Sequence, residues 1–162
     1  MISLLYDSKS CGIFERIVGM KIAIASDHGG FELKQKLMNH YAKQGINLAD
    51  LGTHSQESCD YPDIAHKMTD AILNKSADMG ILICGTGIGI SIAANRVKGI
   101  RAAILYNEEV ARLTREHNNA NIAVFGGRMQ SFDDVVKYFD IFRTTNFSEE
   151  NRHQRRIDEL DN

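Results

Sequence analysis

The strongest architectural signal in this 162-residue chain is the stretch MGILICGTGIG at residues 79–89. Its first half is an unbroken apolar run, which is typical of a parallel strand covered on both faces of its sheet. The glycines that follow predict a tight turn into a helix that begins with ISIAA, residues 90–94. A second apolar run, IAIA at 22–25, ends in the polar segment SDHGG at 26–30. Two strands that each lead through a glycine-rich turn into a helix indicate an α/β fold.

The rest of the chain continues this alternation. We expect strands at 21–26, 46–51, 79–84, 101–106 and 122–126. We expect helices near 30–44, 62–75, 89–97, 107–117 and 131–144, and an extra C-terminal helix near 148–160. The pattern predicts a doubly wound, Rossmann- or flavodoxin-like sheet of five parallel strands in the order 2-1-3-4-5. In that order the first and third strands end side by side, at the switch point where open α/β sheets bind ligands.

The composition narrows the class of protein. With 43% hydrophobic and 25% charged residues, the chain reads as a globular protein of one domain. A net charge of −2 gives no field that would recruit nucleic acid or an anionic membrane. No apolar run approaches the roughly 20 residues that a membrane span needs. Three cysteines without a C-x-x-C pair argue against a disulfide framework or a zinc site, so we expect no metal and a cytoplasmic location.

The first nineteen residues do not share the pattern of the rest. They carry no basic segment followed by a long apolar core, so they make a poor signal peptide. Met20 directly precedes the first clear strand and would make a natural initiator. We interpret residues 1–19 as a misassigned start or a dispensable extension, with a functional arm as the alternative. Residues 20–162 then form the single domain.

The glycine-rich turn after the third strand suggests an anion site. Its G-x-G-x-G spacing differs from the dinucleotide fingerprint, and no Lys-Ser/Thr pair follows as in a Walker loop. The free N–H groups at the start of the next helix suit an oxyanion or a phosphate. Cys84 stands at the mouth of this turn, where a helix N-terminus favours the thiolate and makes it a candidate base. The alternatives are a turn without a ligand and a small buried cysteine.

Histidines and an acid occupy two other turns. Asp27 and His28 follow the first strand, where they are candidates to bind sugar hydroxyls and phosphate. The alternative is a helix cap followed by a solvated turn residue. His117 ends a predicted helix and precedes the asparagine-rich segment 118–121. A histidine there is also explained by the favourable interaction of an imidazolium with a helix C-terminus.

Arginines supply further anion candidates. Arg152 and Arg156 are four residues apart, so both guanidinium groups share one helix face and can grip one phosphate. The alternative is a solvated face on which they pair with Glu149 and Glu159. Arg128, at the end of the fifth strand, is another candidate for anion binding.

Five motifs together carry a resemblance to a known family. They are MKIAIASDHGG at 20–30, DYPD at 60–63, CGTGIGISIAAN at 84–95, HNNAN at 117–121 and GGRM at 126–129. The combination resembles the B-type ribose-5-phosphate isomerases over about residues 20–160. The wider family also contains subunits of galactose-6-phosphate isomerase.

The resemblance implies interconversion of ribose 5-phosphate and ribulose 5-phosphate through a cis-enediolate, without a metal or an organic cofactor. It implies a homodimer or a dimer of dimers, with each active site shared between two chains. By resemblance, Cys84 moves the proton between C2 and C1, His117 opens the furanose ring, and Asp27 lies on the opposite side of the sugar. The remaining site residues are those of the anion hole (Gly85, Gly87, Ile88 and Gly89), Thr86 near the hydroxyl protons, Tyr61 near the sugar, His28, Arg152 and Arg156 on the phosphate, and Asn118 and Arg128 completing the pocket.

Two other functions stay open at this point. One is isomerisation of a six-carbon sugar phosphate, such as allose or galactose 6-phosphate, which the depth of the pocket beyond Tyr61 would decide. The other is a non-catalytic sugar-phosphate-binding or flavodoxin-like signalling module. A receiver-type module would need clustered acids at the strand ends, and the chain offers mainly Asp27 there.

Overall fold

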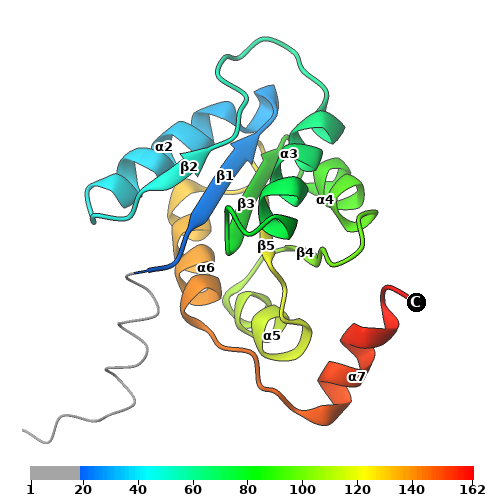
Figure 1. The fold of residues 1–162 in the computed structure, drawn as a ribbon. Helices are drawn as coiled ribbons and strands as arrows, with labels where there is room; N and C mark the ends of the chain where they lie inside the picture. The colour runs from blue at the N-terminus through cyan, green and yellow to red at the C-terminus, as the bar shows by residue number, and fades with distance from the viewer. Residues whose placement is uncertain (1–18) are drawn as a thin grey trace, which may run out of the picture.

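The computed structural model describes residues 19–162, which alternate between strands and helices as the sequence predicts (Figure 1). The predicted extension, residues 1–19, lies outside the described part except for Gly19. The strands are β1 (Ile22–Ser26), β2 (Leu48–Asp50), β3 (Met79–Cys84), β4 (Ala102–Ile104) and β5 (Ile122–Gly126). The helices are the short 3-10 helix η1 (His28–Gly30), α2 (Phe31–Ala42), α3 (Tyr61–Leu73), α4 (Ile88–Asn95), α5 (Glu108–Asn118), α6 (Phe132–Thr144) and α7 (Asn151–Glu159).

All strand pairs are parallel, and the fold class is the predicted one. The order of the sheet is β2-β1-β3-β5-β4, so our prediction for the last two strands was wrong. The reason lies in their burial. All five residues of β5 are buried, which suits a strand between two neighbours, whereas β4 has three half-buried residues and forms an edge. The switch point between β1 and β3 is unaffected, because the chain still leaves β1 toward one side and β3 toward the other.

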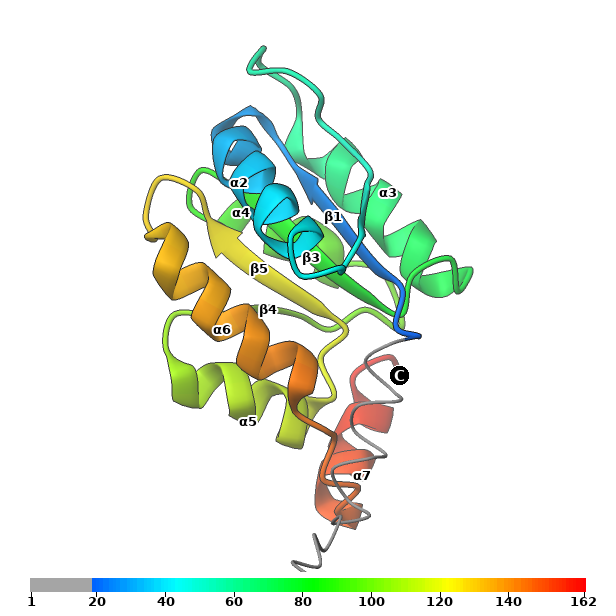
Figure 2. The same cartoon turned by 90° about the vertical axis from the view of Figure 1, so that its left-hand side faces the viewer.

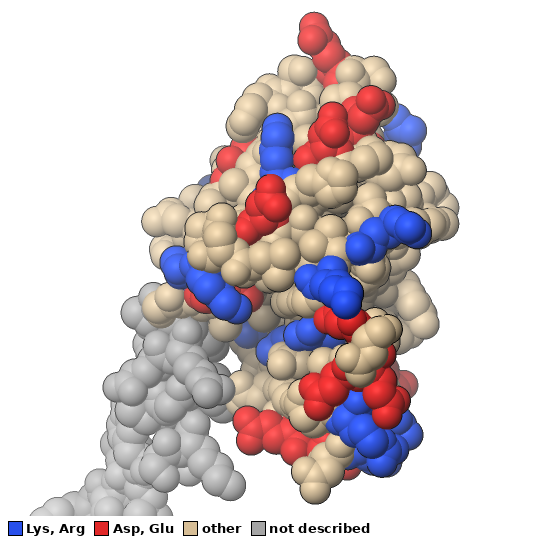
Figure 3. Space-filling model, turned by 45° about the vertical axis from the view of Figure 1, so that its right-hand side comes forward, with Lys and Arg blue, Asp and Glu red and all other residues tan. Residues whose placement is uncertain are grey.

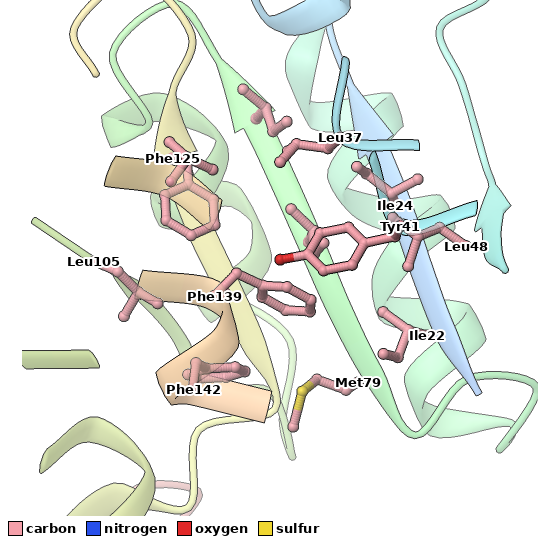
Figure 4. Packing of buried hydrophobic residues seen from close by; sticks show 14 of the residues in the cluster. Ile22, Ile24, Leu37, Tyr41, Leu48, Met79, Leu105, Phe125, Phe139 and Phe142 are labelled. Atoms are coloured by element: carbon pink, nitrogen blue, oxygen red, sulfur yellow. The ribbon is translucent and has the colours of Figure 1, made fainter. Parts of the chain in front are cut away.

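Two layers of helices cover the sheet (Figures 1 and 2). On one face, α2 and α6 pack over the strands and α5 packs against α6. Four aromatic side chains of this face, those of Tyr41, Phe125, Phe139 and Phe142, are fully buried (Figure 4). On the other face, α3 and α4 pack against each other and against β3. Cys84 belongs to that second cluster, because side chains alternate between the two faces of a strand.

The last helix departs from this layered plan. α7 follows a non-helical connection from α6 and packs against α5, beside the sheet rather than over it (Figure 1). Lysine, arginine, aspartate and glutamate side chains are mixed over this lower part of the molecule (Figure 3). Within residues 19–162, no helix has the length and apolar character that a membrane crossing would require.

Candidate active site

The first and third strands end together at the carboxyl edge of the sheet. Ser26, the last residue of β1, pairs with Ile83 of β3. The backbone N–H of Asp27 donates to the carbonyl oxygen of Ile83 at 3.1 Å, which holds the turn after β1 against β3. Asp27 and Cys84 therefore leave the sheet from neighbouring positions.

The Cys84 thiol lies in a polar setting although it is buried. Cys84 is only 5% exposed, and its sulfur accepts a hydrogen bond from the backbone N–H of Gly87 at 3.1 Å. Gly87 has a φ of +82° and immediately precedes α4, so this N–H belongs to the turn that opens the helix. Both an N–H donor and the positive end of a helix stabilise a thiolate. The structure therefore agrees with both interpretations of the sequence. The thiol is buried, as a small core cysteine would be, and it contacts an amide donor, as a candidate base would.

The first turn of α4 has no room for a side chain at Gly89. A Cβ at Gly89 would lie 2.8 Å from Cζ of Tyr61, so the ring of Tyr61 lies directly on the backbone of Gly89. The hydroxyl oxygen of Thr86 accepts a hydrogen bond from the N–H of Ile88 at 3.2 Å. Two of the predicted anion-hole amides, those of Gly87 and Ile88, are therefore engaged by side chains of the turn itself.

Asp27 and His28 are fixed by backbone groups. One carboxylate oxygen of Asp27, a residue only 6% exposed, accepts from the N–H of Gly29 at 2.8 Å and of Gly30 at 3.2 Å, which caps η1. The alternative reading of Asp27 as a cap is therefore observed. Nδ1 of His28 accepts from the N–H of Cys59 at 3.3 Å. That bond leaves Nε2 as the donor of a neutral His28 ring.

A pocket of about 340 Å³ opens beside these groups. Arg128 enters it from the turn after β5, and its guanidinium lies near Gly85, where an added Cβ would be 3.4 Å from Nη1. His28, Gly29 and Gly127 line the same pocket. The structure thus brings Asp27, His28, Tyr61, Arg128 and the turn that follows Cys84 to one edge of the sheet.

The other predicted site residues lie at the opposite edge. Because α5 ends at Asn118, just before β5 begins, His117 and Asn118 lie beside the amino ends of the strands. α7 carries Arg152 and Arg156 and packs against α5 there (Figure 1). The five residues of β5 alone separate the two edges by about 13 Å. Within one chain, then, these four residues do not join Cys84.

In a single chain, Arg152 and Arg156 lie on the surface and do not line a phosphate pocket. Nε of Arg152 donates to a carboxylate oxygen of Glu150 at 2.8 Å, and both side chains are exposed. Arg156 is exposed as well. The alternative interpretation of the sequence paired these arginines with Glu149 and Glu159. In the structure Arg152 pairs with Glu150, and Glu159 lies 4.0 Å from Arg155 rather than beside Arg156.

His153 is a feature of this region that the sequence analysis missed. Its ring stacks on that of His117 with centroids 4.2 Å apart and is only 5% exposed. Nε2 of His153 is buried and finds no hydrogen-bond partner within residues 19–162. Burial lowers the pKa of His153 below its usual value, and the nearby charges of His117 and Arg152 lower it further. A helical spacing analysis of α7 would have found this inward face.

Lys34 is a second residue that sequence reasoning missed. It lies on α2 and is fully buried. Its ammonium donates to Oδ1 of Asp50 and, at 2.7 Å, to the carbonyl oxygen of Thr53. Oδ1 of Asp50 also accepts the N–H of Gly52 at 2.9 Å, and the N–H of Ser26 donates to the carbonyl oxygen of Gly52 at 2.6 Å. The pair therefore secures the segment after β2 against the end of β1.

Gln56, in the segment that follows β2, is a third residue that sequence reasoning missed, and it lines the pocket. Its amide donates to a carboxylate oxygen of Glu32 at 3.0 Å, and both residues line the pocket beside His28. Within residues 19–162, no group of three or more His, Cys, Asp or Glu side chains is placed to hold a metal ion.

Comparison with known proteins gives one consistent family. The model of the Ribose/Galactose Isomerase family matches residues 22–160. The ribose-5-phosphate isomerase B of Escherichia coli K12 is 40% identical over 140 residues, which cover 86% of this chain and 93% of that protein. A crystal structure of a ribose 5-phosphate isomerase from Thermotoga maritima has a TM-score of 0.86 and 52% identity, covering 88% of this chain and 98% of the other. The ribose-5-phosphate isomerase B of Mycoplasma genitalium, solved with bound ribulose-5-phosphate, has a TM-score of 0.81 and 42% identity, covering 88% and 94%.

Proposed function

Because this chain belongs to the ribose/galactose isomerase family, we propose that it interconverts ribose 5-phosphate and ribulose 5-phosphate. The observation that carries the proposal is the sulfur of Cys84, held by the Gly87 N–H at the switch point, on a strand whose end is hydrogen-bonded to the turns that carry His28 and Arg128. Relatives named ribose-5-phosphate isomerase B, and a solved neighbour with bound ribulose-5-phosphate, support this substrate.

The central chemical step is a proton transfer. The Cys84 thiolate takes the proton from C2 of the open-chain aldose, and the electron pair of that C–H bond moves into the C1–C2 bond. The carbonyl electrons pass to O1, which yields the cis-enediolate. O1 takes up a proton and O2 loses one, and as the C2–O2 carbonyl forms, the thiol delivers its proton to C1 to give the ketose. N–H groups of residues 85–89 that the side chains of Cys84 and Thr86 do not engage, such as that of Gly89, would stabilise the negative oxygens, because preorganised donors act where the charge develops.

The remaining steps are assigned from the family resemblance. His117 acts as acid and base in opening the furanose ring, and Thr86 lies near the hydroxyl protons that move between O1 and O2. Asp27 and Tyr61 flank the sugar. No metal or cofactor takes part in this scheme, since the substrate carbonyl itself accepts the electrons.

Cys59 and Cys84 are both free thiols, which fits our expectation of a cytoplasmic location.

We further propose that two chains complete each site. One chain supplies Cys84, His28 and Arg128, and its partner supplies His117, Asn118, Arg152 and Arg156. Two observations support this. The two groups lie at opposite edges of one chain, and an apolar surface surrounds the mouth of the turn after β3. That surface includes Ile88, Ile92, Tyr106 and Met129, of which Met129 is 71% exposed. A patch of this kind on a small protein usually marks an interface.

The test is a comparison of substrates with purified protein. We expect turnover of ribose 5-phosphate to exceed that of allose 6-phosphate and of galactose 6-phosphate in kcat/KM. In deuterated water, the product should gain deuterium at the carbon that receives the proton, which is expected of an enediolate route with an exchanging thiol. Preferred turnover of a hexose phosphate would replace the pentose substrate. Tight binding of ribose 5-phosphate without turnover would identify a binding module.

A further inference from the structure

The helix that bears the proposed phosphate ligands has few attachments to the rest of the chain. α7 packs against α5. Before the helix, the N–H of Ser148 donates to the carbonyl oxygen of Glu116 at 3.0 Å. In its first turn, the ring of His153 stacks on His117. Arg152 and Arg156 project from this helix into solvent, so their position depends on how the helix is held.

Asp161 provides an attachment at the other end of α7. Its Oδ2 accepts a hydrogen bond from the backbone N–H of Gly99 at 2.8 Å. Its carbonyl oxygen accepts from Nζ of Lys98 at 2.6 Å. Both donors belong to the connection between α4 and β4, which is 62 residues away in sequence from Asp161. The charge of Asp161 also reaches Arg101, where it opposes the lowering of the arginine pKa by burial.

The geometry points to Asp161 as a positioning residue for the phosphate-binding arginines. His153 lies in the first turn of α7 and Asp161 lies two residues beyond its last residue, so the two attachments hold opposite ends of the helix. Arg156 lies between them and Arg152 lies next to the first. Two anchors fix the direction of a helix where one would let it pivot. Asp161 thereby sets where Arg152 and Arg156 reach into the partner's site, without touching the substrate itself.

This inference rests on the proposed function, and its chemistry gives a recognisable signature. The phosphate is remote from the carbons that react, so loosening its ligands weakens binding more than the chemical step. Loss of preorganisation costs affinity because mobile arginines must be ordered again on binding. We expect Asp161→Ala to raise KM for ribose 5-phosphate by about twofold to tenfold, with kcat within about twofold of the native value.

The experiment compares Asp161→Ala with Asp158→Ala. Asp158 is a matched control, since it is an acid of the same helix whose carboxylate accepts from the side chain of Gln154 within α7 at 2.7 Å. For Asp161→Ala, the inhibition constant of inorganic phosphate should rise by the same factor as KM, and amide hydrogen exchange should accelerate over residues 151–160. Asp161→Asn keeps an acceptor oxygen for Gly99 and should restore most of the native KM. The control should resemble the native protein in all three measurements.

Each contrary result has a definite meaning. Unchanged exchange over α7, or an equal change in the control, would show that Asp161 does not hold the helix. Faster exchange with native KM and phosphate inhibition would show that the helix is held but that its position does not serve phosphate binding. Either result overturns the proposal.

Two further measurements keep the proposal testable. If Asp161→Ala fails to fold, Lys98→Ala removes the other contact and should raise KM in the same direction; a native KM would again overturn the proposal. If the native protein proves inactive on ribose 5-phosphate, the proposed function fails, while calorimetric binding of inorganic phosphate to the same variants still decides the role of Asp161.

Discussion

The two edges of the sheet hold their polar groups in different ways. At the carboxyl edge, Cys84 and Asp27 are nearly buried, and each accepts hydrogen bonds from backbone N–H groups of its own turn. At the amino edge, Arg152 and Arg156 are exposed on a helix that lies beside the sheet. Proton transfer at carbon needs a base fixed to within fractions of an ångström. A phosphate tolerates more freedom, because long cationic side chains can adjust to it. The contrast fits the proposal that each chain fixes its own base and receives exposed arginines from a partner.

Removing the base gives the largest expected effect, at the carboxyl edge. Cys84→Ser should lower kcat by about 10²–10⁴-fold, because a hydroxyl is a far weaker base than a thiolate. Steady-state rates in both directions measure the effect, and thermal unfolding should show an intact fold. Cys59→Ser, which changes the other free thiol of the described chain, should keep native activity. Near-native turnover by Cys84→Ser would remove the thiol from this role.

The next effect tests whether the amino edge contributes chemistry as well as binding. If His117 opens the furanose ring, His117→Ala should slow the reaction from ribose 5-phosphate by about 10²-fold. The reaction from ribulose 5-phosphate should suffer less in its enediolate step, because this substrate is already open-chain. Proton exchange with deuterated water, followed separately from each substrate, measures the difference. Equal losses of exchange from both sides would contradict this division of labour.

A smaller effect is expected for the phosphate ligands. Arg156→Ala should raise KM about 10- to 100-fold with little change in kcat, since a charge-assisted hydrogen bond contributes about 1.5–3 kcal/mol. Arg155→Ala, which changes the adjacent exposed arginine paired with Glu159, is the control and should keep native KM. A native KM for Arg156→Ala would favour the surface-charge interpretation of α7.

The sharing of sites between chains can be tested directly with two defective variants. In a hybrid of Cys84→Ser and Arg156→Ala chains, one site combines both defects and the other receives an intact residue from each chain. Random exchange makes half of the dimers hybrid, so an equal mixture should recover about a quarter of native activity at low substrate concentration. Mixing either variant with itself should recover none. The absence of recovery after proven subunit exchange would mean that both residues act within one chain.

The smallest effect concerns stability at the amino edge. Burial lowers the pKa of His153 in the folded state, so the unfolded chain binds more protons near and below its ordinary value of about 6.5. The stability that the neutral His153 contributes is present above that pH and is lost as the pH falls toward the folded pKa. His153→Phe keeps a ring against His117 but cannot titrate, so its unfolding free energy should depend less steeply on pH between 7.5 and 5.5. Urea unfolding at several pH values measures the slope, and His66→Phe, at an exposed position of α3, should leave it unchanged.

Local sequence patterns predicted most of the fold. The strand and turn at 79–89, for example, appear as β3 and the start of α4 within one residue of the expected bounds. The order of β4 and β5 escaped prediction because the apolar runs at 101–106 and 122–126 look alike. Only pairing across the sheet decides which of them lies inside it.

The candidate site also contains residues whose proximity the sequence predicted and contacts that it did not predict. Asp27, His28, Cys84 and Arg128 follow strands that end at one edge, so the sheet itself brings them together. The contact of Lys34 with Asp50 and the stacking of His153 on His117 join separate elements, and a local sequence pattern does not identify which residue each of them meets.

The insertion of β5 between β3 and β4 also constrains how the protein emerges from a ribosome. In the described sheet, β4 pairs with β5 alone, and β5 is made about 20 residues later. During synthesis, residues 102–104 therefore leave the exit tunnel before β5, with which they pair in the described sheet, has emerged. The nascent chain can join β1, β2 and β3 early, but its sheet stays open on the β3 side until Gly126 has appeared. The turn that carries Cys84 borders that open side, so the surroundings of the thiol stay incomplete until β5 and Gly127 have emerged.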